Sequence, residues 1–145
     1  IINLGLNKLI RYVRTIGLFN SKAKNIIALS KILIEHHKSE VPNVFEELIK
    51  LPGVGEKTAN VILNEAFRIP TIAVDTHIFR VSHRLELSNS KTPEKVGKDL
   101  IKLIPNKYKL NCHHWLILHG RYTCKARNPI CSKCNISSWC NANKT

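Results

Sequence analysis

The chain has 145 residues, 43% of them apolar, which suits one compact domain or two small helical lobes. Its 23 Lys and Arg residues outnumber its 10 Asp and Glu residues, so the formal net charge is +13. An excess of this size favours a polyanionic partner, with nucleic acid as the first candidate and an acidic membrane surface as the alternative. The chain shows no apolar run long enough for a membrane-spanning helix and no signal-peptide pattern, so we expect no membrane association and a cytoplasmic location.

The first helical pattern follows Asn20-Ser21 and ends near His37, because its apolar residues recur at helical spacing. After a break, Asn43 is expected to cap a short helix over residues 44–50. These two segments lead directly into the most informative stretch of the chain.

The run L-P-G-V-G-E-K-T-A-N predicts a helix-hairpin-helix over about residues 44–67, with its second helix at 56–67. Gly53 and Gly55 would allow backbone angles that a side chain forbids. The N–H groups of such a turn and of the following helix start can point at one phosphate. A plain corner between two helices, with glycine as a C-cap, is the structural alternative. The candidate DNA contacts of the hairpin are Gly53, Val54, Gly55 and Lys57.

Lys57 is the candidate nucleophile of the hairpin. It falls in the first turn of the predicted helix, where the helix dipole is positive and disfavours a further cation. An amine at this place can attack the C1′ atom of a sugar and form a Schiff base. A solvated lysine that pairs with Glu56 or binds phosphate is the alternative, and the local sequence leaves both open.

Asp75 is the candidate catalytic carboxylate, and seventeen residues separate it from Lys57. It lies in the segment I-A-V-D-T-H, at the start of a predicted helix that ends at Leu85. An N-cap role explains this aspartate adequately. The functional interpretation is a carboxylate near the lysine that assists departure of a base, and one residue can serve both purposes.

The remaining periodic segments are helical as well. Thr92-Pro93 is a strong start signal for a helix that runs to about Ile104, and residues 108–122 read as the last long helix. No segment shows a convincing strand alternation. The predicted fold class is therefore all-α, with a loop-rich cysteine tail.

Four of the five cysteines form one constellation with the spacing C-x6-C-x2-C-x5-C. Disulfides are disfavoured because nothing signals secretion. The single C-x2-C pair does not match the paired knuckles of a zinc ribbon, whereas a compact loop of this kind can wrap an iron–sulfur cubane. Zinc stays open as the alternative, and Cys112 is expected to be a buried thiol. The candidate metal ligands are Cys124, Cys131, Cys134 and Cys140.

The loop between the first two of these cysteines carries Lys125 and Arg127. A metal-fixed loop can hold two cations rigidly against a DNA backbone. The alternative is a solvated basic loop.

Three blocks of sequence, L-P-G-V-G-x-K-T-A-N, I-A-V-D-T-H-I-F-R-V and C-H-H-W-L-I-L-H-G-R-Y-T-C, together with the cysteine spacing, resemble the bacterial endonuclease III family. The resemblance covers essentially the whole chain. It implies a DNA glycosylase and AP lyase of base-excision repair, which removes oxidised pyrimidines and cleaves abasic sites by β-elimination. It also implies a monomer that acts on double-stranded DNA in the bacterial nucleoid.

By the same resemblance, Lys57 is the Schiff-base nucleophile and Asp75 the catalytic carboxylate. Cys124, Cys131, Cys134 and Cys140 would ligate a [4Fe–4S] cluster with a structural and DNA-docking role. The implied domains are residues 1–75, part of a lobe that contains the hairpin, and residues 76–145, a lobe that contains the cluster loop (124–140).

One departure from the family concerns the N-terminus. Family members begin well before the residue that matches Ile1, so we expect an N-terminally truncated form of the fold. The alternatives are an inactive or weakly active DNA-binding fragment and an adenine-mismatch glycosylase of the same superfamily. The latter typically lacks the hairpin lysine, so Lys57 argues against it.

Overall fold

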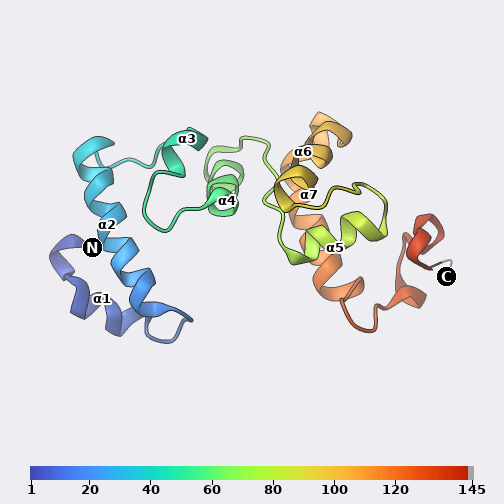
Figure 1. Ribbon diagram of the computed structural model, residues 1–145, viewed down its shortest axis with the longest axis horizontal. Coiled ribbons are helices and arrows are strands. Elements are labelled where there is room, and N and C mark those ends of the chain that lie inside the picture. The colour runs from blue at the N-terminus through green and yellow to red at the C-terminus, as the bar shows by residue number, and fades with distance from the viewer. Residues whose placement is uncertain (144–145) are drawn as a thin grey trace. The chain divides into compact units, whose positions relative to one another are not determined.

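A computed structural model describes residues 1–143, and these residues form helices and loops without any strand. The all-α prediction is therefore confirmed. The chain divides into two compact units, residues 1–59 and the residues from 60 onward, and Figure 1 colours them in chain order from blue to red. The division falls within helix α4, Glu56–Phe67. The lobe boundary expected after residue 75 stays a prediction.

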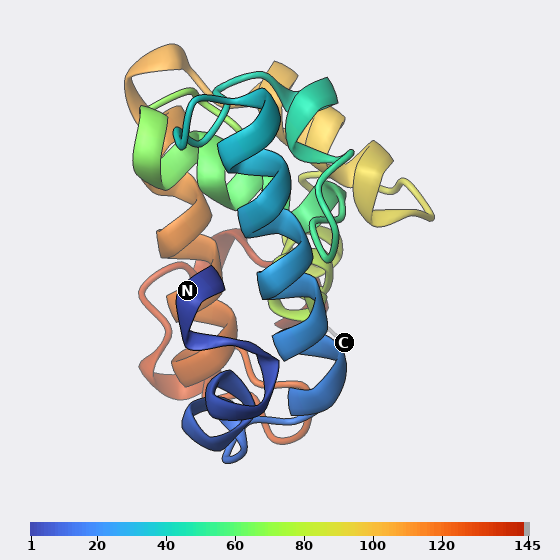
Figure 2. The same cartoon turned by 90° about the vertical axis from the view of Figure 1, so that its left-hand side faces the viewer.

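The first unit begins with a helix that the sequence analysis does not assign. Its apolar residues nevertheless follow helical spacing along L-N-K-L-I-R-Y-V, so the signal was present. This helix packs against the long second helix of the unit (Figure 2). The helices of this unit are α1 (Leu6–Val13), α2 (Phe19–His36), α3 (Phe45–Leu48) and the start of α4.

The boundaries of these helices differ in two places from the expected ones. Helix α2 starts just before Asn20, after Leu18 in a left-handed backbone conformation. Helix α3 is a single turn whose N-cap is Val44, without any side-chain cap, so the prediction that Asn43 caps it is wrong. The second hairpin helix has the predicted bounds, 56–67.

The second unit packs three helices around one apolar cluster. These helices are α5 (Thr76–Arg84), α6 (Pro93–Leu103) and α7 (Asn106–Leu118). The buried members of the cluster are Ile72, Ile78, Val96, Leu100 and Cys112. Burial raises the pKa of the Cys112 thiol, which is consistent with the predicted buried thiol. Thr92 caps α6 through its hydroxyl, as its Thr-Pro signal indicates.

Helix α7 is shorter than predicted, because regular helix ends at Leu118 and a π-helical turn follows at His119–Thr123. Gly120 lies in this turn, and a Cβ atom there would come within 2.9 Å of His77 Cβ and 3.1 Å of Val81 Cγ2. The glycine therefore permits close contact between the turn and α5. Short 3-10 turns follow at Cys131–Lys133, Ser137–Trp139 and Asn141–Asn143. Among the described helices, none combines the length and apolar character needed to cross a bilayer.

Candidate functional site

The glycine hairpin is a tight backbone turn between α3 and α4. The Val54 N–H donates to the Leu51 carbonyl at 3.0 Å, and the Gly55 carbonyl accepts the first helical hydrogen bond of α4 from Ala59 N–H at 2.9 Å. Leu51 and Ala59 are buried on either side of the turn. The local sequence therefore fixes where α4 begins.

The two hairpin glycines have different roles. Gly53 has φ +79°, and a Cβ atom there would lie 2.8 Å from Asn25 Nδ2 and 2.9 Å from Asn25 Cβ on α2. Gly55 does not have a positive φ, and an added Cβ would meet nothing within 4 Å. The expectation that both positions need special backbone angles is thus wrong for Gly55. What Gly55 offers is open space beside the start of α4.

Lys57 is exposed in the first turn of α4. Among the described residues it forms no ion pair with Glu56 or any other carboxylate, so the salt-bridged alternative is not found. The first backbone N–H groups of a helix have no partner within the helix. The exposed amine of Lys57 and the N–H groups at the start of α4 therefore lie in the same helical turn, directly after the glycine turn.

Asp75 is the N-cap of α5. Its Oδ1 accepts hydrogen bonds from His77 N–H at 2.9 Å and Ile78 N–H at 2.8 Å. No donor among the described residues contacts Oδ2, and the side chain is half-buried. The capping prediction is confirmed. Lys57 belongs to the first unit and Asp75 to the second, so their proximity stays a prediction.

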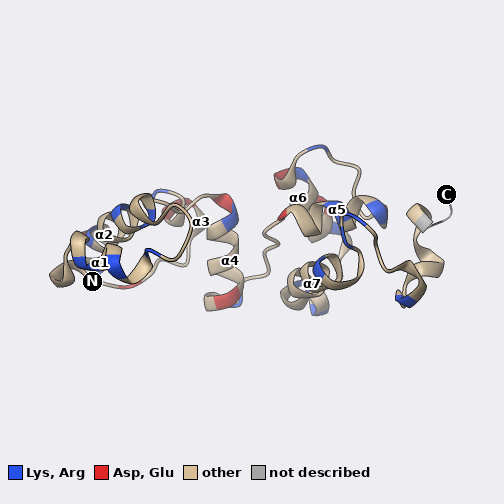
Figure 3. Ribbon diagram, turned by 90° about the horizontal axis from the view of Figure 1, so that it is seen from below, with Lys and Arg blue, Asp and Glu red and all other residues tan. Residues whose placement is uncertain are grey.

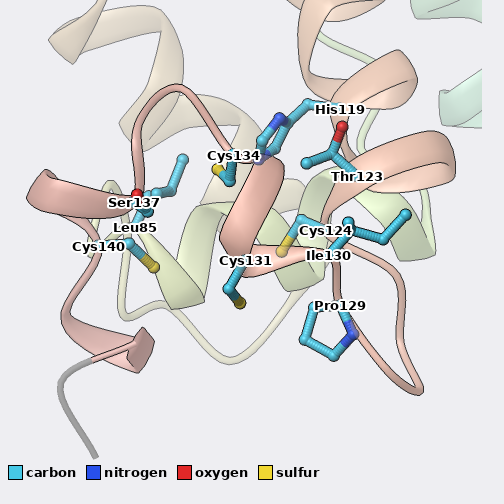
Figure 4. A pocket seen from close by; sticks show the side chains of 10 residues that line it. All are labelled: Leu85, His119, Thr123, Cys124, Pro129, Ile130, Cys131, Cys134, Ser137 and Cys140. Atoms are coloured by element: carbon cyan, nitrogen blue, oxygen red, sulfur yellow. The ribbon is translucent and has the colours of Figure 1, made fainter.

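The four clustered cysteines line one pocket of the second unit (Figure 4). All four are half-buried free thiols. Leu85, Pro129 and Ile130 provide apolar walls, and burial lowers the pKa of His119, which also lines the pocket. Within residues 1–143, no three Cys, His, Asp or Glu side chains are arranged to hold a single metal ion.

Two arginines of α5, which the sequence analysis gives no role, hold the cysteine segment. Arg80 donates to the Cys124 carbonyl at 3.0 Å and to the Gly120 carbonyl at 2.7 Å. Arg84 donates from Nη1 to Cys124 Sγ at 3.3 Å. A pair of arginines four residues apart on one helix face was the available signal, but such a pair is ordinarily a solvated face.

The basic loop, residues 124–130, closes on the Thr123 carbonyl. That oxygen accepts from Lys125 N–H at 3.0 Å and from Ile130 N–H at 2.9 Å. The side chains of Lys125 and Arg127 are exposed. Figure 3 shows further Lys and Arg residues on helices and loops of both units. The loop therefore presents two cations from a closed backbone.

Comparisons with known proteins identify the family to which this chain is similar. The family model described as "HhH-GPD superfamily base excision DNA repair protein" matches residues 1–106. Endonuclease III of Rickettsia felis is 59% identical over 140 residues, which are 97% of this chain and 66% of that protein. Endonuclease III of Escherichia coli K12 is 55% identical over 139 residues, 96% of this chain and 66% of that protein. The chain thus spans about two thirds of the length of these curated relatives.

A solved structure shares the fold as well. "Structure of a Trapped Endonuclease III-DNA Covalent Intermediate: Estranged-Adenine Complex" superposes with a TM-score of 0.91 at 44% identity, covering 99% of this chain and 68% of that one. The matched family model covers the hairpin, Lys57 and Asp75. The chain belongs to the HhH-GPD superfamily of base excision DNA repair proteins.

Proposed function

We propose that this chain acts in base-excision repair as a DNA glycosylase with AP lyase activity, which removes oxidised pyrimidines and cleaves abasic sites. The observation that carries the proposal is the exposed Lys57, placed one residue into α4 directly behind the glycine turn. The likeness to a structure titled as a trapped covalent intermediate with DNA supports it, because such an intermediate requires a nucleophile.

Lys57 would perform the covalent step. Its Nζ atom attacks C1′ of the damaged nucleotide, and the base departs with the electrons of the glycosidic bond. The amine then loses one proton, the C1′–O4′ bond of the sugar breaks and O4′ takes up a proton, which leaves a protonated Schiff base between Nζ and C1′. Removal of a proton from C2′ then breaks the C3′–O3′ bond, which cuts the strand, and water hydrolyses the imine to release Lys57.

Asp75 would assist departure of the base as a carboxylate. Both of its cap hydrogen bonds fall on Oδ1, so Oδ2 keeps its lone pairs for the reacting nucleotide. A fixed negative charge stabilises the positive charge that develops on the sugar as the base leaves. The cap thus orients the carboxylate while one oxygen remains available.

The hairpin would hold a phosphate of double-stranded DNA. Gly53, Val54, Gly55 and Lys57 surround the start of α4, where backbone N–H groups and the helix dipole favour an anion. The open space at Gly55 supports a close approach of the backbone to DNA. Lys125 and Arg127 would add contacts from the second unit.

The pocket residues fit a [4Fe–4S] cluster. The donor set is four thiols within one apolar-walled pocket, and each iron of a cubane takes one thiolate. Cys124, Cys131, Cys134 and Cys140 would hold it. When bound, the cluster supplies a rigid cross-link between the end of α7 and the cysteine tail. Iron-free, zinc-loaded protein purified without oxygen would instead support the zinc alternative.

Borohydride trapping on a duplex with an abasic site tests the proposal. The natural chain should give a covalent protein–DNA adduct, and Lys57→Gln should give none while still binding DNA. Lys50→Gln is the matched control, because Lys50 is exposed in the same unit just before the turn. A persistent adduct in Lys57→Gln would identify another amine as the nucleophile.

The same assay separates the competing functions. If the natural chain binds DNA yet never forms an adduct, the non-enzymatic DNA-binding fragment or the adenine-mismatch glycosylase becomes the better interpretation. The expectations of a monomer and of a cytoplasmic, nucleoid-associated location stay predictions.

A further inference from the structure

We propose that Arg84 is a positioning residue that shapes the basic loop for phosphate contact. It does so through the same guanidinium group that contacts Cys124. The inference rests on the proposed function, because it takes Lys125 and Arg127 as DNA contacts and Cys124 as a cluster ligand. It adds a residue that links the two, and that residue lies outside the cysteine tail.

Three hydrogen bonds place the guanidinium of Arg84. Nη1 donates to the Lys125 carbonyl at 2.7 Å and to Cys124 Sγ at 3.3 Å. Nη2 donates to the Ala126 carbonyl at 3.2 Å. One planar fork therefore bonds to three consecutive residues of the loop, all about forty positions away in sequence.

These contacts hold the carbonyl groups in the middle of the basic loop. The ends of the loop are closed by the Thr123 carbonyl, and the Cys124 carbonyl is bound by Arg80. Among the described residues, only Arg84 donates to the Lys125 and Ala126 carbonyls. With both carbonyls directed toward α5, the exposed side chains of Lys125 and Arg127 are presented from a fixed backbone.

The contact with Cys124 ties this shape to the state of the cysteine site. A thiolate that ligates iron is a stronger acceptor than a free thiol, so the hydrogen bond from the Arg84 cation should strengthen when the site is loaded. A hydrogen bond to a cluster sulfur also changes the reduction potential of the cluster. Donation from a cation favours the more negative, reduced form, so losing this bond should lower the potential.

Arginine is needed here because its fork is planar and rigid, with five N–H donors in fixed directions. A lysine at position 84 keeps the charge but offers a single ammonium on a flexible stem. It cannot reproduce two parallel carbonyl contacts together with the sulfur contact. Arg84→Lys therefore removes the guanidinium geometry but keeps the charge, whereas Arg84→Met removes both.

The test measures the binding of cluster-loaded protein to an abasic-site analogue duplex over a range of salt concentrations. Arg84→Met and Arg84→Lys should each reduce the slope of log K against log salt by about one, as expected for a lost phosphate contact. Both variants should also lower the midpoint potential of the cluster. Lys98→Met is the matched control, because it also removes one positive charge. Lys98 is exposed on α6 and, among the described residues, donates no hydrogen bond to the loop.

A double variant shows whether Arg84 acts through the loop. If it does, Arg84→Met combined with Lys125→Ala should reduce the slope by less than the sum of the two single effects. Additive effects would mean that Arg84 contacts DNA itself, which overturns the positioning role. Full rescue of slope and potential by Arg84→Lys would show that only the charge matters, which overturns it as well.

Lys125→Ala and Arg127→Ala distinguish failure of the inference from failure of the proposed function. If these two variants reduce the slope and Arg84→Met does not, the inference alone is overturned. If none of the three changes the slope, the loop is not a phosphate contact, and the proposed DNA interface is wrong together with the inference.

Discussion

The two compact units hold their candidate functional residues in different ways. In the first, the hairpin is set by backbone conformation, with Gly53 in a left-handed angle against Asn25. In the second, side chains do the holding: Asp75 caps α5, and Arg80 and Arg84 bind the cysteine segment. The hydrogen bonds of the hairpin turn join residues three or four positions apart, although Gly53 also lies against Asn25 on another helix. In the second unit the Asp75 cap is local, whereas Arg80 and Arg84 bind residues about forty positions away.

This difference has a practical consequence for substitutions. A backbone-defined turn tolerates changes wherever an added side chain finds open space. A segment held by side chains is sensitive at the donor, even when the donor is far from the segment in sequence.

The largest effect is expected for Asp75→Asn. Asparagine caps helices about as well as aspartate, so stability should change little, whereas loss of the carboxylate should slow base excision by about a hundredfold or more. Single-turnover kinetics and thermal unfolding measure the two. Near-normal turnover would reduce Asp75 to a structural cap.

Asp75→Ala serves as the control for that experiment. It removes the cap together with the carboxylate, so it should also lower the free energy of unfolding by about 1 kcal/mol. If Asp75→Asn were equally destabilised, the kinetic loss could not be assigned to the missing charge.

Cys134→Ser should act on the second unit alone. Removing one thiolate should prevent stable cluster binding, with loss of the brown colour and a fall of roughly 2 kcal/mol or more in the free energy of unfolding. Hydrogen exchange should show faster opening of the cysteine tail and unchanged protection of the hairpin. Cys112→Ser is a suitable comparison, because that thiol lies in the helical core. A colourless natural protein would contradict the cluster assignment.

Gly53→Ala and Gly55→Ala should behave oppositely. At position 53 the backbone is left-handed and the new Cβ would collide with Asn25, so the free energy of unfolding should fall by about 1–3 kcal/mol. At Gly55 it meets open space, so stability should be kept while DNA binding weakens. Denaturant unfolding and DNA titration test the pair. Unchanged DNA affinity in Gly55→Ala would show that DNA does not approach the turn closely.

The smallest effect is expected for the exposed cations of the basic loop. Lys125→Ala and Arg127→Ala should each reduce the slope of log K against log salt by about one, equally on damaged and undamaged duplex. An effect confined to damaged DNA would mean that the loop reads the lesion rather than positions the backbone.

The elements that local signals specify could be predicted from the sequence. The bounds of α4 follow from the glycine turn, and the caps at Asp75 and Thr92 follow from residues that accept hydrogen bonds from the next turn. The candidate residues come from the same signals. The shared pocket of the four cysteines also agrees with their spacing.

What could not be predicted depends on contacts distant in sequence. The need for glycine at position 53 comes from Asn25 on another helix. The π-helical turn at His119–Thr123 lies against α5, where Gly120 meets His77. The roles of Arg80 and Arg84 appear only once α5 and the cysteine segment are side by side. Helix α1 is different, because the apolar residues Leu6, Leu9, Ile10 and Val13 already follow helical spacing in the sequence.

Helix α5 sets the distance between two candidate functional residues of the second unit. Asp75 is its N-cap and Arg84 its last residue, and nine helical residues span about 14 Å at 1.5 Å per residue. Helical geometry also sets the rotation between them, since each residue turns the chain by about 100°. Inserting one residue into α5 would therefore leave Asp75 as the N-cap but turn Arg84 away from Cys124, so the length of this helix is as constrained as its side chains.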